Sequence, residues 1–115
     1  MSGGVNSRDL GSRGESRGVE YLQNLGYSII EQNFYARKMG EIDIIAQKDG
    51  VLHFIEVKSA YRDFDPIYNL TPRKLHKIVN SAHYYIRIKN IDSAFSIDAL
   101  IIRGREIEFI ENISL

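Results

Sequence analysis

The pair Asp49-Gly50 restricts the fold of this chain more than any other feature of its sequence. Asp-Gly is a preferred two-residue turn of a β-hairpin, and here it stands between two strand-like runs, Glu41–Gln47 and Val51–Ser59. A two-residue turn fixes the pairing of the strands that it joins, so Lys48 is expected to face Val51. The sequence therefore predicts a hairpin of defined register near the middle of the chain.

This register brings acidic side chains together on one face of the hairpin. Asp43 is expected opposite Glu56, and Glu41 opposite Lys58, with the Cβ atoms of a facing pair roughly 4.5–5.5 Å apart. The charged face also holds two apolar residues nearer the turn: Glu41, Asp43, Ile45, Phe54, Glu56 and Lys58. The other face is almost wholly apolar and is expected to belong to the core: Ile42, Ile44, Ala46, His53, Ile55 and Val57. A longer turn with a bulge would shift this register.

Two carboxylates that face each other repel, unless one is protonated or a cation lies between them. A small cluster of hard oxygen ligands suits Mg²⁺, with Mn²⁺ as a possible substitute, and such ions share their remaining positions with water and phosphate oxygens. Lys58 projects to the same side as Glu56 and can hold an attacking water or neutralise charge in a phosphoryl transition state. Asp43, Glu56 and Lys58 therefore favour a metal-dependent nuclease-type site.

A purely structural interpretation of the same residues also stands. Glu56 and Lys58 can form a surface ion-pair ladder with Glu41 and Asp43, and such a ladder contributes ~0–1 kcal/mol to stability. A glutamate inside the apolar run 53–57 favours the functional interpretation, because a carboxylate in apolar surroundings normally needs a partner. His53 falls on the core-facing side and is expected to be a hydrogen-bonded core residue, as is Asp98 in its apolar strand.

The remaining periodicity predicts an α/β fold with a mixed sheet and flanking helices. A helix is expected from about Asp9 to Leu25, with Gly26 in the left-handed position after its end, and a second one begins at Thr71-Pro72. The other expected strands are Tyr27 to about Arg37, Phe95–Arg103 and Glu106–Ile110, and a loop is expected at Tyr61–Leu70. The predicted order is α-β-β-β-α-β-β.

Composition and charge limit the classes of protein to which the chain can belong. Its 115 residues suit a single domain over 1–115, whose Gly/Ser-rich residues 1–8 are expected to be flexible. There is no cysteine, no secretory signal and no apolar run long enough to span a bilayer, so a cytoplasmic protein without membrane association is expected. The formal net charge is zero, which counts against an indiscriminate nucleic-acid binder. However, the acidic segment 41–58 is followed by a basic one, 59–90, and this order suits a metal site beside a phosphate-binding surface. Charge alone favours the simpler interpretation of an ordinary solvated helix face.

The carboxylate and lysine pattern resembles that of PD-(D/E)xK nucleases, whose restriction-endonuclease-like fold includes archaeal Holliday-junction resolvases. The stretches Gly40-Glu-Ile-Asp-Ile-Ile-Ala and Phe54-Ile-Glu-Val-Lys-Ser resemble more closely the YraN-like family of small bacterial proteins with that fold. The resemblance extends over Gly14-Glu15, Leu25-Gly26-Tyr27, Asn33, Thr71-Pro-Arg-Lys74 and Ile97-Asp98, and it thus spans the chain from about Gly11 to Ile102.

The resemblance implies roles for individual residues of the site. Asp43 and Glu56 would be metal ligands, helped by the carbonyl group of Val57, and Lys58 would be the catalytic lysine. Glu15 would reach the site from the first helix; considered without the family, it is an ordinary acidic residue in a first helical turn.

On the substrate side, the resemblance implies that Lys74 and its neighbour Arg73 lie near the nucleic acid. The family commonly has a basic residue two positions after the lysine, where this chain has Ala60, and Arg62 could replace it. The family also commonly has alanine in place of Gly18, a difference that concerns packing only.

Two functions remain open from the sequence. The first is a Mg²⁺-dependent endonuclease-like enzyme that hydrolyses DNA phosphodiesters, with branched or junction DNA suggested by the resolvase resemblance. A homodimer with two-fold symmetry would suit a symmetric junction. The second is a nuclease-fold binding module that recognises nucleic acid or a protein partner without cleavage, which the neutral charge and Ala60 favour.

Overall fold

The computed structural model describes the backbone of residues 7–60 and 70–113 and the side chains of residues 14–59 and 70–113. It is an α/β fold in which two helices pack on one mixed sheet of five strands. The elements are α1 (Ser7–Asn24), β1 (Ser28–Tyr35), η1 (Arg37–Met39), β2 (Glu41–Lys48), β3 (Val51–Ala60), α2 (Pro72–Ile88), β4 (Ala94–Arg103) and β5 (Glu106–Ile110). The predicted α/β class and element order are confirmed. The expectations for residues 1–6 and 61–69 lie outside the described ranges.

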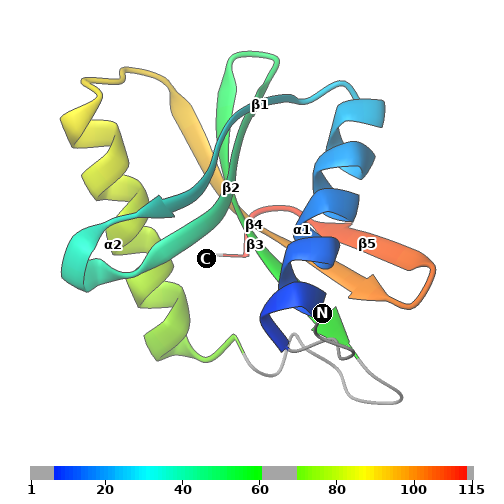
Figure 1. Cartoon of the computed structure of the whole chain (residues 1–115). Helices are drawn as coiled ribbons and strands as arrows, with labels where there is room; N and C mark the ends of the chain where they lie inside the picture. Colours follow the sequence, from blue (N-terminus) through cyan, green and yellow to red (C-terminus); the bar gives the residue numbers. More distant parts are fainter. Residues whose placement is uncertain (1–6, 61–69, 114–115) are drawn as a thin grey trace.

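The strands lie in the order β1-β2-β3-β4-β5 (Figure 1). β1, β2 and β3 form an antiparallel meander, β4 runs parallel to β3, and β5 returns antiparallel to β4. Parallel neighbours need a crossover connection, and α2 is the helix of that connection. Within the described ranges, neither helix has the length and apolar character that a membrane span requires.

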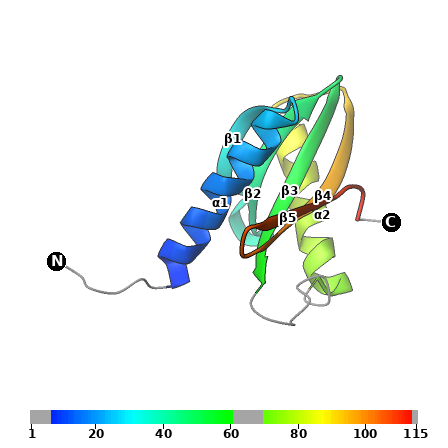
Figure 2. The ribbon, with the colours of Figure 1, turned by 90° about the vertical axis from the view of Figure 1, so that its right-hand side faces the viewer.

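The sheet is covered on both faces, by α1 on one side and by α2 on the other (Figure 2). Ile44 and Ile55 pack with Leu22 of α1, whereas Phe54 packs with Ala82 and Tyr85 of α2. The apolar face predicted as core is buried as expected, with only Val57 half-buried. Its residues are divided between the two layers, because Ile42 packs in the α2 cluster and Ile44 in the α1 cluster. The turn-proximal part of the opposite face is buried as well, because Ile45 and Phe54 lie fully inside.

The hairpin forms in the predicted register. Ile44 pairs with Ile55, and the pairing continues to Lys48 and Val51 beside the turn. Asp49 and Gly50 have φ values of 52° and 77°, and left-handed angles at both central residues define the turn type that Asp-Gly favours in hairpins. Local turn chemistry thus sets which side chains of β2 and β3 share a face.

Helix α1 packs closely on the sheet because its contacting face carries glycines. A Cβ atom at Gly18 would lie 2.5 Å from Leu100 Cδ2, and one at Gly14 would lie 3.0 Å from Ser59 Oγ. Gly26 follows the helix with a φ of 94°, as predicted, and Tyr27 N–H donates to the carbonyl oxygen of Leu22. These glycines weaken helix propensity, yet they let α1 bring Glu15 next to the strands.

The strand predicted from Tyr27 to Arg37 ends earlier, at Tyr35. The Ala36 N–H donates to the Gly40 carbonyl oxygen at 2.7 Å, so the chain reverses through η1 before β2 begins. Arg37 adopts a φ of 55° and Gly40 a φ of 128°, which a continuous strand does not allow. The alternation of apolar and polar residues did not reveal this reversal.

Candidate active site

The two strands of the hairpin part at their charged ends. Regular pairing of β2 with β3 stops at Ile44 and Ile55. Beyond this pair, Asp43 Oδ2 accepts a hydrogen bond from the Val57 N–H at 2.8 Å. Neither the predicted opposition of Asp43 and Glu56 nor that of Glu41 and Lys58 is therefore a ladder pair. The acidic side chains are held by a side-chain-to-backbone contact, at a point where the sheet opens.

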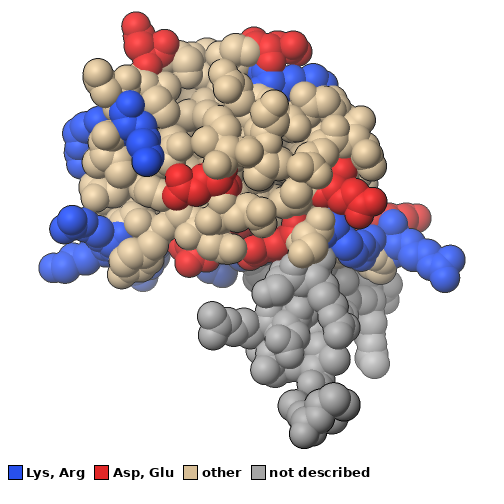
Figure 3. Space-filling view, turned by 45° about the horizontal axis from the view of Figure 1, so that its top comes forward, with Lys and Arg blue, Asp and Glu red and all other residues tan. Residues whose placement is uncertain are grey.

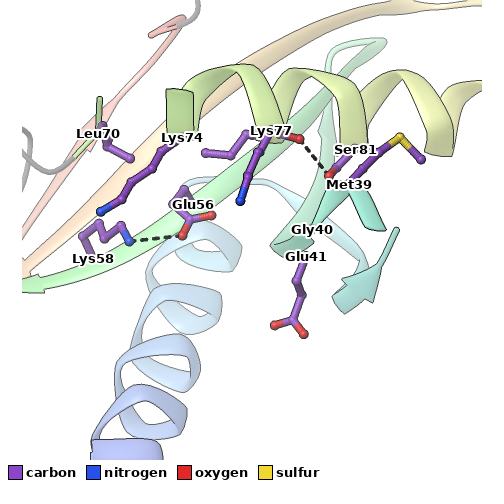
Figure 4. A pocket seen from close by; sticks show the side chains of 10 residues that line it. Met39, Gly40, Glu41, Glu56, Lys58, Leu70, Lys74, Lys77 and Ser81 are labelled. Carbon is purple, nitrogen blue, oxygen red and sulfur yellow. Dashed lines mark hydrogen bonds and ion pairs between the residues drawn. The ribbon is translucent and has the colours of Figure 1, made fainter. Parts of the chain in front are cut away.

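A cleft of about 160 Å³ lies at this opening, between the ends of the strands and α2. Its described lining combines charged and apolar residues from η1 to α2: Met39, Gly40, Glu41, Glu56, Lys58, Leu70, Lys74, Lys77, Ile78 and Ser81. Lys58 Nζ lies 3.4 Å from Glu56 Oε1 in an ion pair. In Figure 4, Lys74 and Lys77 extend from α2 toward the strand that carries Glu56 and Lys58.

Asp43 is in an environment that penalises its ionised form. Burial, together with the negative charge of Glu56, raises the pKa of Asp43 from 3.8 to about 8, although the hydrogen bond from Val57 opposes the shift. Glu15 and Glu41 raise the pKa of Asp43 further. Burial also raises the pKa of Glu56, against the opposing charge of Lys58 and a hydrogen bond with Asp43. The two carboxyl groups thus compete with each other for a proton or a cation.

The predicted site residues fall into two groups. Asp43, Glu56, Lys58 and the backbone of Val57 are brought together, and Glu15 approaches closely enough to act electrostatically on Asp43. On the substrate side, the structure distinguishes the three predicted residues. Lys74 lines the cleft, Arg73 is exposed and is not among its described lining residues, and Arg62 lies outside the described residues.

Sequence reasoning missed Lys77 and Ser81, which line the cleft beside Lys74. The three residues follow one another at helical spacing on one face of α2, and Ser81 Oγ donates to the Lys77 carbonyl oxygen at 2.8 Å. The spacing from Lys74 was the available signal. It was obscured because Lys77 lies outside the apolar stripe of the helix.

The donor set fits a hard divalent cation that is bound only in part by the protein. No group of three histidine, cysteine or acidic side chains able to hold a metal by themselves occurs among the described residues. Two carboxylates, Asp43 and Glu56, are nevertheless enough for Mg²⁺, which usually keeps several waters and takes further oxygen ligands from a substrate phosphate. A cation between them would also relieve the repulsion that raises the pKa of Asp43.

His53 and Asp98 form a separate polar network in the core. Asp98 is fully buried, and its Oδ2 lies 2.5 Å from His53 Nδ1. Its Oδ1 accepts hydrogen bonds from Ser96 Oγ and from the Asn112 N–H. The predicted interpretation as hydrogen-bonded core residues is confirmed, and the network fastens the segment after β5 to β4.

The fold and the cleft together define a small α/β protein with paired carboxylates and a lysine at one end of a mixed sheet. The chain belongs to the uncharacterised protein family UPF0102, whose model matches residues 14–102. The match includes Glu15, the hairpin and the helix that carries Lys74, which agrees with the YraN-like resemblance of the sequence.

Relatives from several bacteria match almost the full chain. A UPF0102 protein of Sulfurovum sp. is 62% identical over 106 residues, which cover 92% of this chain and 94% of that protein. One of Wolinella succinogenes is 60% identical over 109 residues, or 95% and 99% of the two chains. One of Helicobacter hepaticus is 49% identical over 111 residues, or 96% and 99%.

Proposed function

We propose that this protein is a metal-dependent endonuclease of the restriction-endonuclease-like fold that hydrolyses phosphodiesters in DNA, with branched DNA as the favoured substrate. The observation that carries the proposal is the juxtaposition of two largely buried carboxyl groups, Asp43 and Glu56, with Lys58. Lys58 forms an ion pair with Glu56, and these two residues line the cleft. Like charges so placed destabilise the fold unless a cation or a proton separates them.

In this proposal, Asp43 and Glu56 hold Mg²⁺, or Mn²⁺ in its place. When bound, the ion supplies an acidified water and neutralises charge on the scissile phosphate. Lys58 releases Glu56 and turns its ammonium group toward the phosphate, where it stabilises the added negative charge of the transition state. Glu15 and Glu41 strengthen the negative potential that attracts the cation.

Lys74 and Lys77 supply the contacts to the DNA backbone. They are exposed on α2, and both extend into the cleft opposite the carboxylates (Figure 4). Lysine side chains bind phosphate as compact positive charges. Two of them, one helical turn apart, would hold phosphates of the strand on the side of the cleft away from the acids.

The activity is tested by nicking of a labelled four-way DNA junction in Mg²⁺ or Mn²⁺. Lys58→Ala should lower the rate by at least about 100-fold, the usual cost of removing a group that stabilises transition-state charge. Arg105→Ala, an exposed substitution in the β4–β5 turn, is the matched control and should nick as the wild type does. Equal rates for wild type and Lys58→Ala would identify a contaminant and refute the assignment.

The α2 lysines are tested by binding rather than cleavage. Lys74→Ala and Lys77→Ala should each weaken DNA binding and reduce the slope of log affinity against log salt by about 1, as expected for one lost phosphate contact. Arg87→Ala, on the same helix but outside the cleft lining, should leave the slope unchanged. Unchanged slopes for both lysine variants would exclude this part of the proposal.

A binding module without cleavage is the second candidate, and Ala60 is the observation that favours it. The related sequences of the resemblance commonly carry a basic residue at this position, so this chain has no phosphate contact from residue 60 unless Arg62 replaces it. This candidate predicts DNA binding that depends on Lys74 and Lys77, with no nicking above the Lys58→Ala background.

A further inference from the structure

The reversal between β1 and β2 forms a groove that the proposed chemistry does not use. It measures about 570 Å³ and is lined by Tyr35, Arg37, Lys38 and Met39. Tyr35 is 69% exposed, the most exposed of the large apolar side chains in the described part of the chain. Arg37 and Lys38 are exposed too, and neither forms an ion pair with any described residue. Within the described ranges, an aromatic ring without a ring partner thus lies beside two cations that form no ion pair.

The groove lies on a turn that is closed by two backbone hydrogen bonds. The Ala36 N–H donates to the Gly40 carbonyl oxygen, and the Met39 N–H donates to the Ala36 carbonyl oxygen at 3.1 Å. Ala36 is fully buried, and Met39 packs against the core beneath α2. The exposed side chains therefore project from a fixed backbone, which lowers the entropy that a ligand must overcome on binding.

The groove adjoins the carboxylate cleft. Met39 lines both, and Gly40 and Glu41 follow it directly into the cleft. On the face shown in Figure 3, Lys and Arg side chains lie at both sides of the molecule, including the side of α2 and η1, and several acidic side chains lie between them. A nucleic-acid strand with one phosphate beside Asp43 and Glu56 would therefore run from these acidic residues toward the basic residues of the groove.

We propose that the groove binds an unpaired nucleotide of the nucleic acid whose scissile phosphate lies in the cleft. Its base stacks on Tyr35, and its phosphate contacts Arg37 and Lys38. Aromatic rings stack on any base, and neighbouring cations hold the backbone, so such a site prefers unpaired over paired strands with little regard to sequence. This assignment of the groove rests on the proposed function, because the nucleotide that it binds belongs to the nucleic acid of that function.

The test measures binding without cleavage, in EDTA, by fluorescence anisotropy. The probes are a labelled DNA duplex with two splayed single-stranded arms and a blunt duplex of the same length. Tyr35→Ala should weaken binding of the splayed probe by about 5- to 100-fold, the range expected for one lost base stack, and should leave blunt-duplex binding unchanged. Tyr35→Trp should retain the affinity of the wild type, because stacking needs only an aromatic face.

The control is Ile30→Ala, which changes another exposed apolar residue on the same edge strand, outside the groove lining. It should bind both probes as the wild type does. Arg37→Ala and Lys38→Ala should weaken binding of the splayed probe, and Arg105→Ala should not. Wild-type affinity of Tyr35→Ala for the splayed probe would overturn the proposal, and so would an equal loss on both probes.

Failure of the groove and failure of the proposed enzyme are distinguishable. Preference for the splayed probe that depends on Tyr35, with no metal-stimulated nicking, would support the groove and refute hydrolysis. Nicking that depends on Lys58 but not on Tyr35 would support hydrolysis and refute the role of the groove. Sedimentation of Tyr35→Ala as a smaller species than the wild type, with unchanged DNA binding, would make the groove an interface between copies and overturn its role in nucleic-acid binding.

Discussion

At the scale of single residues, Asp43 is the most informative side chain. Its Oδ2 is fixed by the Val57 N–H, and its carboxyl group is placed against Glu56. In a site without metal this geometry favours the protonated form, whereas a divalent cation would favour the ionised form. The same pair of carboxyl groups lowers the stability of the fold when both are ionised and can hold a metal ion. Both effects can be measured.

The first consequence is a dependence of stability on pH. Because the pKa of Asp43 rises from 3.8 to about 8 on folding, the stability that its proton contributes is complete below 3.8 and is lost as pH rises to about 8. In EDTA, the free energy of unfolding measured by urea titration should fall between pH 5 and pH 8, by no more than about 1.4 kcal/mol per pH unit for one proton.

Asp43→Asn should flatten this fall, because asparagine does not titrate. Mg²⁺ should also raise the melting temperature of the wild type more at pH 8 than at pH 6, since the cation and the proton compete for one site. A stability in EDTA that increases from pH 5 to pH 8 would contradict the assigned environment of Asp43.

At the scale of elements, the close packing of α1 on the sheet places Glu15 near Asp43. The helix approaches this closely because Gly14 and Gly18 face Ser59 and Leu100. The site is thus assembled from two elements. The register of the hairpin is set by its own turn, whereas the distance between α1 and the sheet is set by glycines, which have no side chains. A larger side chain at the contact between α1 and the sheet should therefore lower the stability of the protein before it changes the activity of the site.

Gly18→Leu tests this contact. Even an added Cβ atom at this position would lie 2.5 Å from Cδ2 of the buried Leu100. The larger leucine side chain should therefore lower the free energy of unfolding by about 1–3 kcal/mol through overpacking. Leucine is a good helix former, so the loss would not reflect helix propensity. Ser16→Leu, on the exposed face of the same helix, should change stability by less than about 0.5 kcal/mol. Equal effects of both substitutions in urea titrations would refute the close packing.

At the scale of the whole molecule, local signals predicted most of the fold. Asp49-Gly50 defined the register from Lys48–Val51 to Ile44–Ile55, the pair next to Asp43 and Glu56. Thr71 caps α2 as expected, with its Oγ1 accepting from the Lys74 N–H. β5 has the predicted bounds, Glu106–Ile110. These features depend on neighbours in sequence, whose preferences are set by turn and cap geometry.

Features that depend on tertiary contact were not predictable in the same way. Leu25 continues the apolar spacing of α1 but is 43% exposed, because the helix ends at Asn24 and the chain leaves the helix axis through Gly26. The parting of the strands beyond Ile44 arises from the bond between Asp43 and Val57, and the η1 reversal from a bond between Ala36 and Gly40. Lys77 joins the site only because α2 crosses over the open ends of the strands.

The central claim is that Asp43 and Glu56 together bind a divalent cation, and calorimetric titration with Mn²⁺ at pH 7.5 tests it most directly. We expect saturable binding by the wild type and by Arg105→Ala, and at least a tenfold loss of affinity in Asp43→Asn and in Glu56→Gln, each shown to be folded by circular dichroism. Wild-type affinity for Mn²⁺ in both carboxylate variants would contradict it.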